Sequence, residues 1–206
     1  MNKTIQILQF LQEKDLLKTS PKFWWPSYGN FEVVLGAILT QNTTWINVEK
    51  SLKNLQNHLE LDSFISLDED ILKEYIKPSG FYNQKAPRLL ALANNIKQTY
   101  GSFKTFQDNT TRKWLLDQKG VGEETADAIL CYGCKKEYFV VDTYTKRLFK
   151  KFDIEFKTYK EYQNYIQNGI ESNWDSIKEE FENNLNLCYA KFHGMIVEYN
   201  KKEKYV

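Results

Sequence analysis

Cysteine is scarce in this sequence, which limits the cross-links and metal centres that the chain can build. Three cysteines occur in 206 residues, Cys131, Cys134 and Cys188. An odd number of thiols in a chain without an export signal predicts reduced side chains rather than a disulfide framework. The Cys-x-x-Cys pair leaves a metal or redox role open, but buried thiols are the favoured interpretation because no second pair is present.

Long apolar runs are also missing. No uninterrupted stretch reaches the roughly 18 residues that suggest a membrane-spanning helix. Residues 1–15, MNKTIQILQFLQEKD, have the pattern of an amphipathic helix and not the apolar core of a signal peptide. We therefore expect a cytoplasmic protein with no membrane partner. Hydrophobic residues make up 42% of the chain, which is enough for the core of one large or two small domains.

A large excess of positive charge is absent as well. The 28 Lys and Arg residues against 27 Asp and Glu residues leave a net charge of +1, whereas nucleic-acid-binding domains usually carry a strongly basic face. The charge is unevenly spread, because residues 131–151 contain six basic and two acidic side chains. This segment is the candidate basic surface.

Strand-like alternation is nearly absent, and helical periodicity dominates. Apolar residues recur at three- and four-residue steps in 5–11, 31–38, 71–75 and 89–96. Turn signals rich in Pro, Gly, Ser and Asn separate these segments. The pattern predicts an all-α fold.

Glycine is sparse, so the pair that flanks Val121 is informative. In residues 115–142, LLDQKGVGEETADAILCYGCKKEYFVVD, Gly120 and Gly122 stand between two apolar helical patterns. Both glycines are able to adopt positive φ and to approach a ligand closely. The following helix would begin with unpaired amides that suit a phosphate. The alternative is an ordinary corner between two helices, but the fixed spacing to Asp142 favours a DNA-binding hairpin joined to a catalytic acid.

These motifs resemble a known family. KGVGEETADAIL (119–130) followed by VVDTYTKRL (140–148) is similar to the helix-hairpin-helix and catalytic aspartate of the endonuclease III superfamily of DNA glycosylases. LGAILTQNT (35–43) and IKPSGFYNQKA (76–86) resemble two DNA-facing segments of that family, in the same order. More narrowly, the Trp-Trp-Pro at 24–26, the aromatic Trp45 after TQNT, and CYAKFHG (188–194) resemble the small bacterial 3-methyladenine DNA glycosylases that lack an iron–sulfur cluster.

The resemblance implies two helical domains with the active cleft between them. The central domain would span 29–141 and contain the helix-hairpin-helix at about 112–130. Residues 1–28 and 142–206 would form the second, discontinuous domain. The chain has too few cysteines for the four ligands of the cluster that many relatives carry. We expect no cofactor and no catalytic metal, although the family permits a monovalent cation on the hairpin carbonyls.

The catalytic residue implied by the resemblance is Asp142. Cleavage of an N-glycosidic bond leaves positive charge on the sugar, which a carboxylate stabilises, and the apolar residues 139–141 limit its solvation. Asp142 also fits the N-cap of the next helix, and both roles are compatible. Bifunctional relatives carry a nucleophilic lysine where this chain has Glu124, so we expect no strand cleavage. His193 is interpreted as structural.

The remaining site residues are also implied by the resemblance. DNA phosphates would be bound by the hairpin, and Gln41 and Phe81 would act as wedges that fill the gap left by an extruded base. For Gln41 a surface cap is the alternative, and for Phe81 a core anchor. The hairpin residues are Lys119, Gly120, Val121, Gly122 and Thr125.

An aromatic pocket would hold the damaged base, because a π-face attracts a flat, cationic purine. Its predicted members are Trp24, Trp25, Pro26, Trp45 and Met195. Trp45 stands where the narrower family can have a smaller aromatic, and Met195 stands where a basic residue is expected. The lesion range therefore does not follow from the sequence.

The predicted function is a monomeric, monofunctional glycosylase that removes alkylated purines from double-stranded DNA and leaves an abasic site, with 3-methyladenine as the expected substrate. Such an enzyme would associate with the bacterial nucleoid through DNA. Two alternatives remain open at this point: a glycosylase for a mismatched or oxidised base, and a non-catalytic DNA-binding module.

Overall fold

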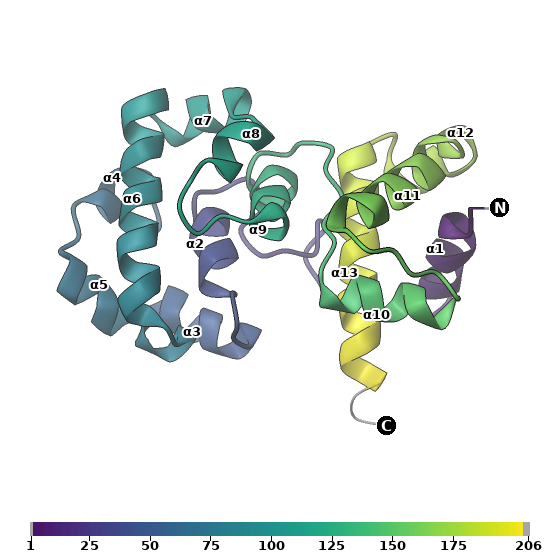
Figure 1. Ribbon diagram of the computed structural model, residues 1–206, viewed down its shortest axis with the longest axis horizontal. Coiled ribbons are helices and arrows are strands. Elements are labelled where there is room, and N and C mark those ends of the chain that lie inside the picture. Colours follow the sequence, from purple (N-terminus) through teal and green to yellow (C-terminus); the bar gives the residue numbers. More distant parts are fainter. Residues whose placement is uncertain (1, 204–206) are drawn as a thin grey trace. The chain divides into compact units, whose positions relative to one another are not determined.

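The computed structural model describes residues 2–203, and within them every regular element is a helix (Figure 1). The all-α prediction is confirmed. The chain divides into two compact units. Unit 1 comprises residues up to Pro26 and from Lys136 onward, and unit 2 comprises Ser27–Lys135.

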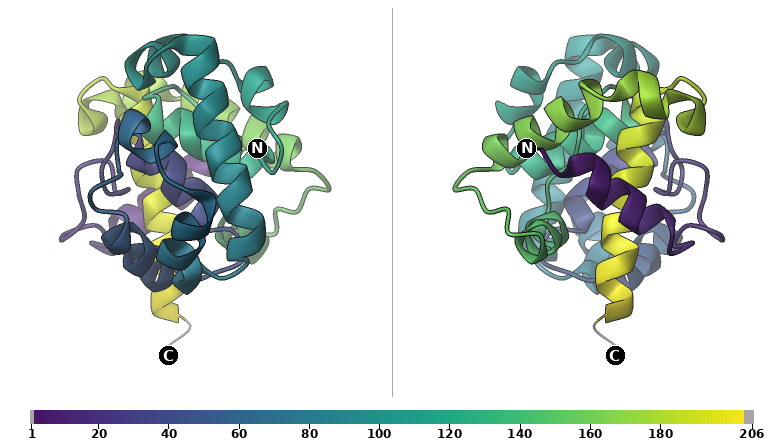
Figure 2. Two further views of the ribbon diagram at one scale, coloured as in Figure 1. Left: turned by 90° about the vertical axis from the view of Figure 1, so that its left-hand side faces the viewer. Right: turned by 90° about the vertical axis from the view of Figure 1, so that its right-hand side faces the viewer.

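Unit 2 is built around a long helix, α6 (Tyr82–Tyr100), which contacts α2, α4, α5 and α7 and is the long helix facing the viewer in Figure 2 (left). The apolar α2 is buried from Val33 to Leu39. The other elements are α2 (Glu32–Leu39), α3 (Trp45–Asn54), α4 (Leu61–Ile65), α5 (Glu69–Ile76), the 3-10 turn η1 (Lys77–Ser79), α7 (Phe103–Asn109), α8 (Arg112–Leu116), α9 (Glu123–Ala128) and the π-helical turn η2 (Ile129–Gly133).

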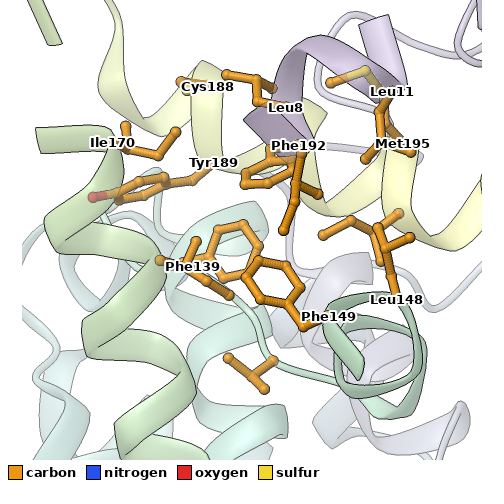
Figure 3. Close-up of a cluster of buried hydrophobic side chains, with 14 of the residues drawn as sticks. Leu8, Leu11, Phe139, Leu148, Phe149, Ile170, Cys188, Tyr189, Phe192 and Met195 are labelled. Atoms are coloured by element: carbon orange, nitrogen blue, oxygen red, sulfur yellow. The ribbon is translucent and has the colours of Figure 1, made fainter. Parts of the chain in front are cut away.

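Unit 1 is organised by α13 (Leu185–Glu203), which contacts α1 (Thr4–Gln12) and α10 (Thr143–Lys151). Figure 2 (right) shows α1 lying against α13. The remaining elements are α11 (Tyr159–Glu171), α12 (Trp174–Ile177) and the 3-10 turn η3 (Lys178–Phe181). Phe139 packs against Tyr189 and Phe192 in the core of this unit, with ring centroids 5.9 and 5.4 Å apart (Figure 3).

The second boundary between the units falls between residues 135 and 136, ahead of the expected boundary at 141/142. The reason is the packing of the segment that leads to Asp142. Phe139 and Val141 are buried in the core of unit 1, and Gln163 of α11 donates from Nε2 to the Phe139 carbonyl at 2.8 Å.

The three cysteines are buried, and no disulfide joins them. Burial raises the pKa of the Cys188 thiol to about 12. Across residues 2–203, no three or more His, Cys, Asp or Glu side chains gather in an arrangement that would hold a metal ion. None of the helices in that range is both long and apolar enough to cross a membrane.

Candidate functional site

Asp142 is the N-cap of α10, and its carboxylate is held in one orientation. Oδ1 accepts hydrogen bonds from the backbone N of Thr145 at 2.7 Å and from its hydroxyl at 2.9 Å. The Thr145 hydroxyl also accepts from the Asp142 backbone N at 3.5 Å, which completes a capping box. The N-cap interpretation is therefore correct, and the cap uses Oδ1 and not Oδ2.

The second carboxylate oxygen faces His193 on α13. Oδ2 lies 3.5 Å from His193 Nε2, and the Asp142 side chain is 14% exposed. Burial opposes ionisation, but the His193 ring and the two Thr145 donors outweigh it and hold the pKa of Asp142 below its usual value. Asp142 is consequently an anion at neutral pH with one oxygen fixed by the helix N-terminus.

Trp24 lies beside the same histidine. Its indole ring meets the His193 ring edge-to-face with centroids 5.3 Å apart, and its Nε1 donates to Glu198 Oε1 at 3.2 Å. The backbone of Trp24 has φ = +64°. Because Gly194 has no side chain, the Trp24 ring can lie close to α13. A Cβ at residue 194 would stand 2.3 Å from Trp24 Cγ. Asp142, His193 and Trp24 therefore form one group within unit 1.

The other predicted pocket residues lie in different surroundings. Trp25 is buried and packs edge-to-face on Trp24 at 6.0 Å, whereas Pro26 is exposed. Trp45 belongs to unit 2, where it opens α3 and donates from Nε1 to Glu49 at 2.9 Å.

Met195 packs in the core of unit 1 near Leu11 (Figure 3). It also borders a cavity of about 330 Å³ that Lys18, Lys22 and Lys191 help to line. Its placement in a base pocket stays a prediction.

The hairpin between α8 and α9 adopts a turn that uses positive φ at one of its two glycines. Gly120 has φ = +86°, a conformation that favours glycine, and a Cβ there would meet the Arg88 side chain, with Cδ at 2.6 Å. Gly122 has φ = −92° with an extended ψ, so it does not use the positive φ that glycine permits. Val121 is buried, whereas Lys119 and Glu124 are exposed.

A buried ion pair that the sequence did not reveal joins the two hairpin helices. Arg112 of α8 contacts both carboxylate oxygens of Asp127 on α9, at 2.7 and 3.1 Å, and also reaches Glu123 at 3.2 Å. Asp127 is fully buried. This bidentate pair ties α8 to α9 on the two sides of the hairpin.

Gln41, the first predicted wedge, is tied to that hairpin. Its Nε2 donates to the Gly120 carbonyl and to the Thr125 hydroxyl, both at 3.0 Å. Gly120 and Thr125, which are predicted to contact DNA phosphates, thus accept hydrogen bonds from the Gln41 side chain. The Gly120 carbonyl is also one of the hairpin carbonyls on which the family permits a monovalent cation.

Phe81, the second predicted wedge, is 57% exposed. The core-anchor alternative is therefore wrong. The backbone is left-handed at both Gly80 (φ = +68°) and Phe81 (φ = +49°), immediately before α6. A bulky side chain with positive φ is uncommon and is typical of functional surfaces.

Comparison with known proteins identifies the family of the chain. A family model described as "HhH-GPD superfamily base excision DNA repair protein" matches residues 35–172. The chain belongs to this superfamily. Endonuclease III of Thermotoga maritima is 31% identical over 119 residues, which cover 57% of this chain and 54% of that protein.

Two relatives are similar over most of the chain. A "Putative DNA repair glycosylase" of Methanocaldococcus jannaschii is 44% identical over 87% of this chain and 80% of its own length. The crystal structure of the H. pylori 3-methyladenine DNA glycosylase bound to 1,N6-ethenoadenine is 46% identical, with a TM-score of 0.93 over 97% of this chain and 98% of that one. The HhH-GPD protein described here is a DNA glycosylase of the base excision repair superfamily.

More distant structures share the fold. A DNA complex of endonuclease III superposes with a TM-score of 0.72 at 18% identity, over 96% of this chain and 85% of that one. The predicted fold class and family are confirmed, whereas the roles of the individual site residues stay predictions.

Proposed function

We propose that this HhH-GPD protein is a monofunctional glycosylase that excises 3-methyladenine from double-stranded DNA and leaves an abasic site. The observation that carries the proposal is the Asp142 carboxylate, which is ionised, nearly buried and fixed through Oδ1 while Oδ2 faces His193. A fixed anion in a site of low solvation stabilises developing positive charge more strongly than a mobile, hydrated one does.

In this mechanism Asp142 stabilises the oxocarbenium-like sugar as the base departs and orients the attacking water. Alkylated purines such as 3-methyladenine are good leaving groups, so a separate general acid is not required. His193 positions the carboxylate and does not itself act on the base.

The absence of lyase chemistry follows from Glu124. A carboxylate cannot form the imine with the sugar that strand cleavage requires. Lys119 is exposed on the loop before the first hairpin glycine, where it serves phosphate contact or solvation.

The choice of an alkylated purine is supported by Trp24 and by the relatives. Trp24 is partly exposed beside Asp142's partner His193, and its indole face attracts a cationic ring. The 46% identical H. pylori protein is a 3-methyladenine glycosylase seen with 1,N6-ethenoadenine, an adenine that carries an added ring. We extend that substrate class to this chain.

Base release from randomly methylated duplex DNA tests the proposal. Wild-type protein should release 3-methyladenine without nicking the strand, and Asp142→Asn should lose nearly all release while still binding. Asp175→Asn is the matched control, because Asp175 is an exposed carboxylate of unit 1 that pairs with Lys178 at 2.7 Å. It should behave as wild type.

Three results would overturn the proposal in different ways. Release of an oxidised or mismatched base instead would change the lesion, and tight binding with no release of any base would indicate a non-catalytic module. A borohydride-trapped adduct in a yield comparable to turnover would show that the enzyme is bifunctional.

A further inference from the structure

Lys85 is a buried lysine in unit 2 that the mechanism above does not use. Its side chain is 2% exposed. The ammonium donates to two main-chain carbonyls, that of Leu39 at 2.7 Å and that of Ser79 at 2.9 Å. Burial lowers the pKa of this lysine to about 8.

The two acceptors lie at the bases of the two predicted wedges. Leu39 is the last residue of α2, two positions before Gln41. Ser79 ends η1, two positions before Phe81. The backbone N of Lys85 also donates to the Phe81 carbonyl at 2.9 Å. Lys85 therefore contacts the backbone of both wedge-bearing segments.

Charge explains why a lysine occupies this buried place. The carbonyls at the end of a helix have no partners within it and carry the negative end of the helix dipole. The Lys85 ammonium donates to the Leu39 carbonyl and still has donors for the Ser79 carbonyl in the turn. An apolar side chain has no donor, and a hydroxyl has only one. The cost of burying the charge is offset only while both carbonyls are in place.

We propose that Lys85 is a positioning residue that sets the spacing between Gln41 and Phe81, so that both enter the base stack together when the damaged base is extruded. Gln41 also donates to the Gly120 carbonyl and the Thr125 hydroxyl of the hairpin. The inference rests on the proposed glycosylase function and on the wedge roles that the family resemblance implies for Gln41 and Phe81.

The test uses full-length protein and a duplex with a tetrahydrofuran abasic analogue beside 2-aminopurine, whose emission reports stacking without catalysis. Lys85→Met keeps the length of the side chain but removes the donors. Its emission change on binding should fall, and its single-turnover release of 3-methyladenine should slow about tenfold, as expected for the loss of a charged hydrogen bond. Affinity for the abasic duplex should stay within about threefold of wild type because the hairpin is unchanged.

Ser51→Ala is the matched control. Ser51 is fully buried in the same unit and donates to the Asn47 and Ile76 carbonyls, so it reports general loosening. It should keep the wild-type emission change. Lys85→Gln, which retains one donor group, should restore part of the signal and provides a second variant if Lys85→Met does not fold.

The proposal fails if a folded Lys85→Met or Lys85→Gln gives the wild-type emission change, or if Ser51→Ala is equally defective. It also fails if wild-type protein binds the abasic duplex with no emission change. These outcomes are independent of the test of the lesion. Wild-type protein that changes the emission of the abasic duplex but releases no 3-methyladenine would refute the proposed substrate and not the proposed role of Lys85.

Discussion

Replacing Gly194 with alanine should reduce base excision far more than it reduces the stability of the protein. In the wild type the Trp24 ring lies where a Cβ of residue 194 would be, with Trp24 Cγ, Cβ and Cδ1 at 2.3, 2.7 and 2.8 Å from that position. Carbon atoms pack at about 3.5–4.0 Å. The indole must therefore withdraw by more than about 1 Å in Gly194→Ala.

The stability change should be modest because two effects oppose each other. Overpacking costs about 1–3 kcal/mol, whereas replacing glycine by alanine inside a helix recovers about 0.5–1 kcal/mol. We expect a net loss of at most about 2.5 kcal/mol in the free energy of unfolding, measured by urea denaturation.

Excision should fall much further. If Trp24 holds the damaged base, a displacement of about 1 Å reduces kcat/KM for methylated DNA by roughly 100-fold. Gly133→Ala is the control, because its Cβ would lie 3.5 Å from Val33, an ordinary contact. A Gly194→Ala protein with wild-type kcat/KM would show that Trp24 is not a pocket wall.

Three further outcomes are expected. Asp127→Asn should destabilise the protein to urea by about 3 kcal/mol, since it removes the buried carboxylate charge that pairs with Arg112. A loss below about 1 kcal/mol in the same assay would contradict this expectation. Because the folded-state pKa of Asp142 is lowered, its interactions as an anion contribute stability above the unfolded pKa of about 4 that is lost as pH falls through the folded pKa. The stability gap between wild type and Asp142→Asn should therefore shrink as pH falls below about 4. The pKa of Lys85 is lowered from 10.5 to about 8, so the unfolded chain binds more protons than the folded protein does between about pH 8 and 10.5. Wild-type stability should therefore rise relative to that of Lys85→Met as pH increases across that interval. Parallel profiles of stability against pH for the two proteins would refute the burial of a charged Lys85.

Local patterns in the sequence predicted much of the fold and part of the site. Periodicity indicates the helices, because burial of one helical face repeats every three to four residues. Asp142 at the start of a helical segment indicates an N-cap, because Asp is favoured at that position, whereas its capping-box partner Thr145 came from the structure. The need for glycine at residue 120 follows from turn geometry, although its neighbour at 122 shows that glycine alone does not prove positive φ.

Tertiary structure decided the contacts between residues that lie far apart in the chain. Gln41 meets Thr125 across 84 positions, and Lys85 meets the Leu39 carbonyl across 46. The contact of His193 with Asp142 is equally non-local. Such pairs depend on how helices pack, and no local pattern encodes packing between distant segments. The sequence by itself determined the helical class, the hairpin and the acid that follows it; only the packed helices decided which side chains orient that acid and which buried lysine holds the two wedge segments.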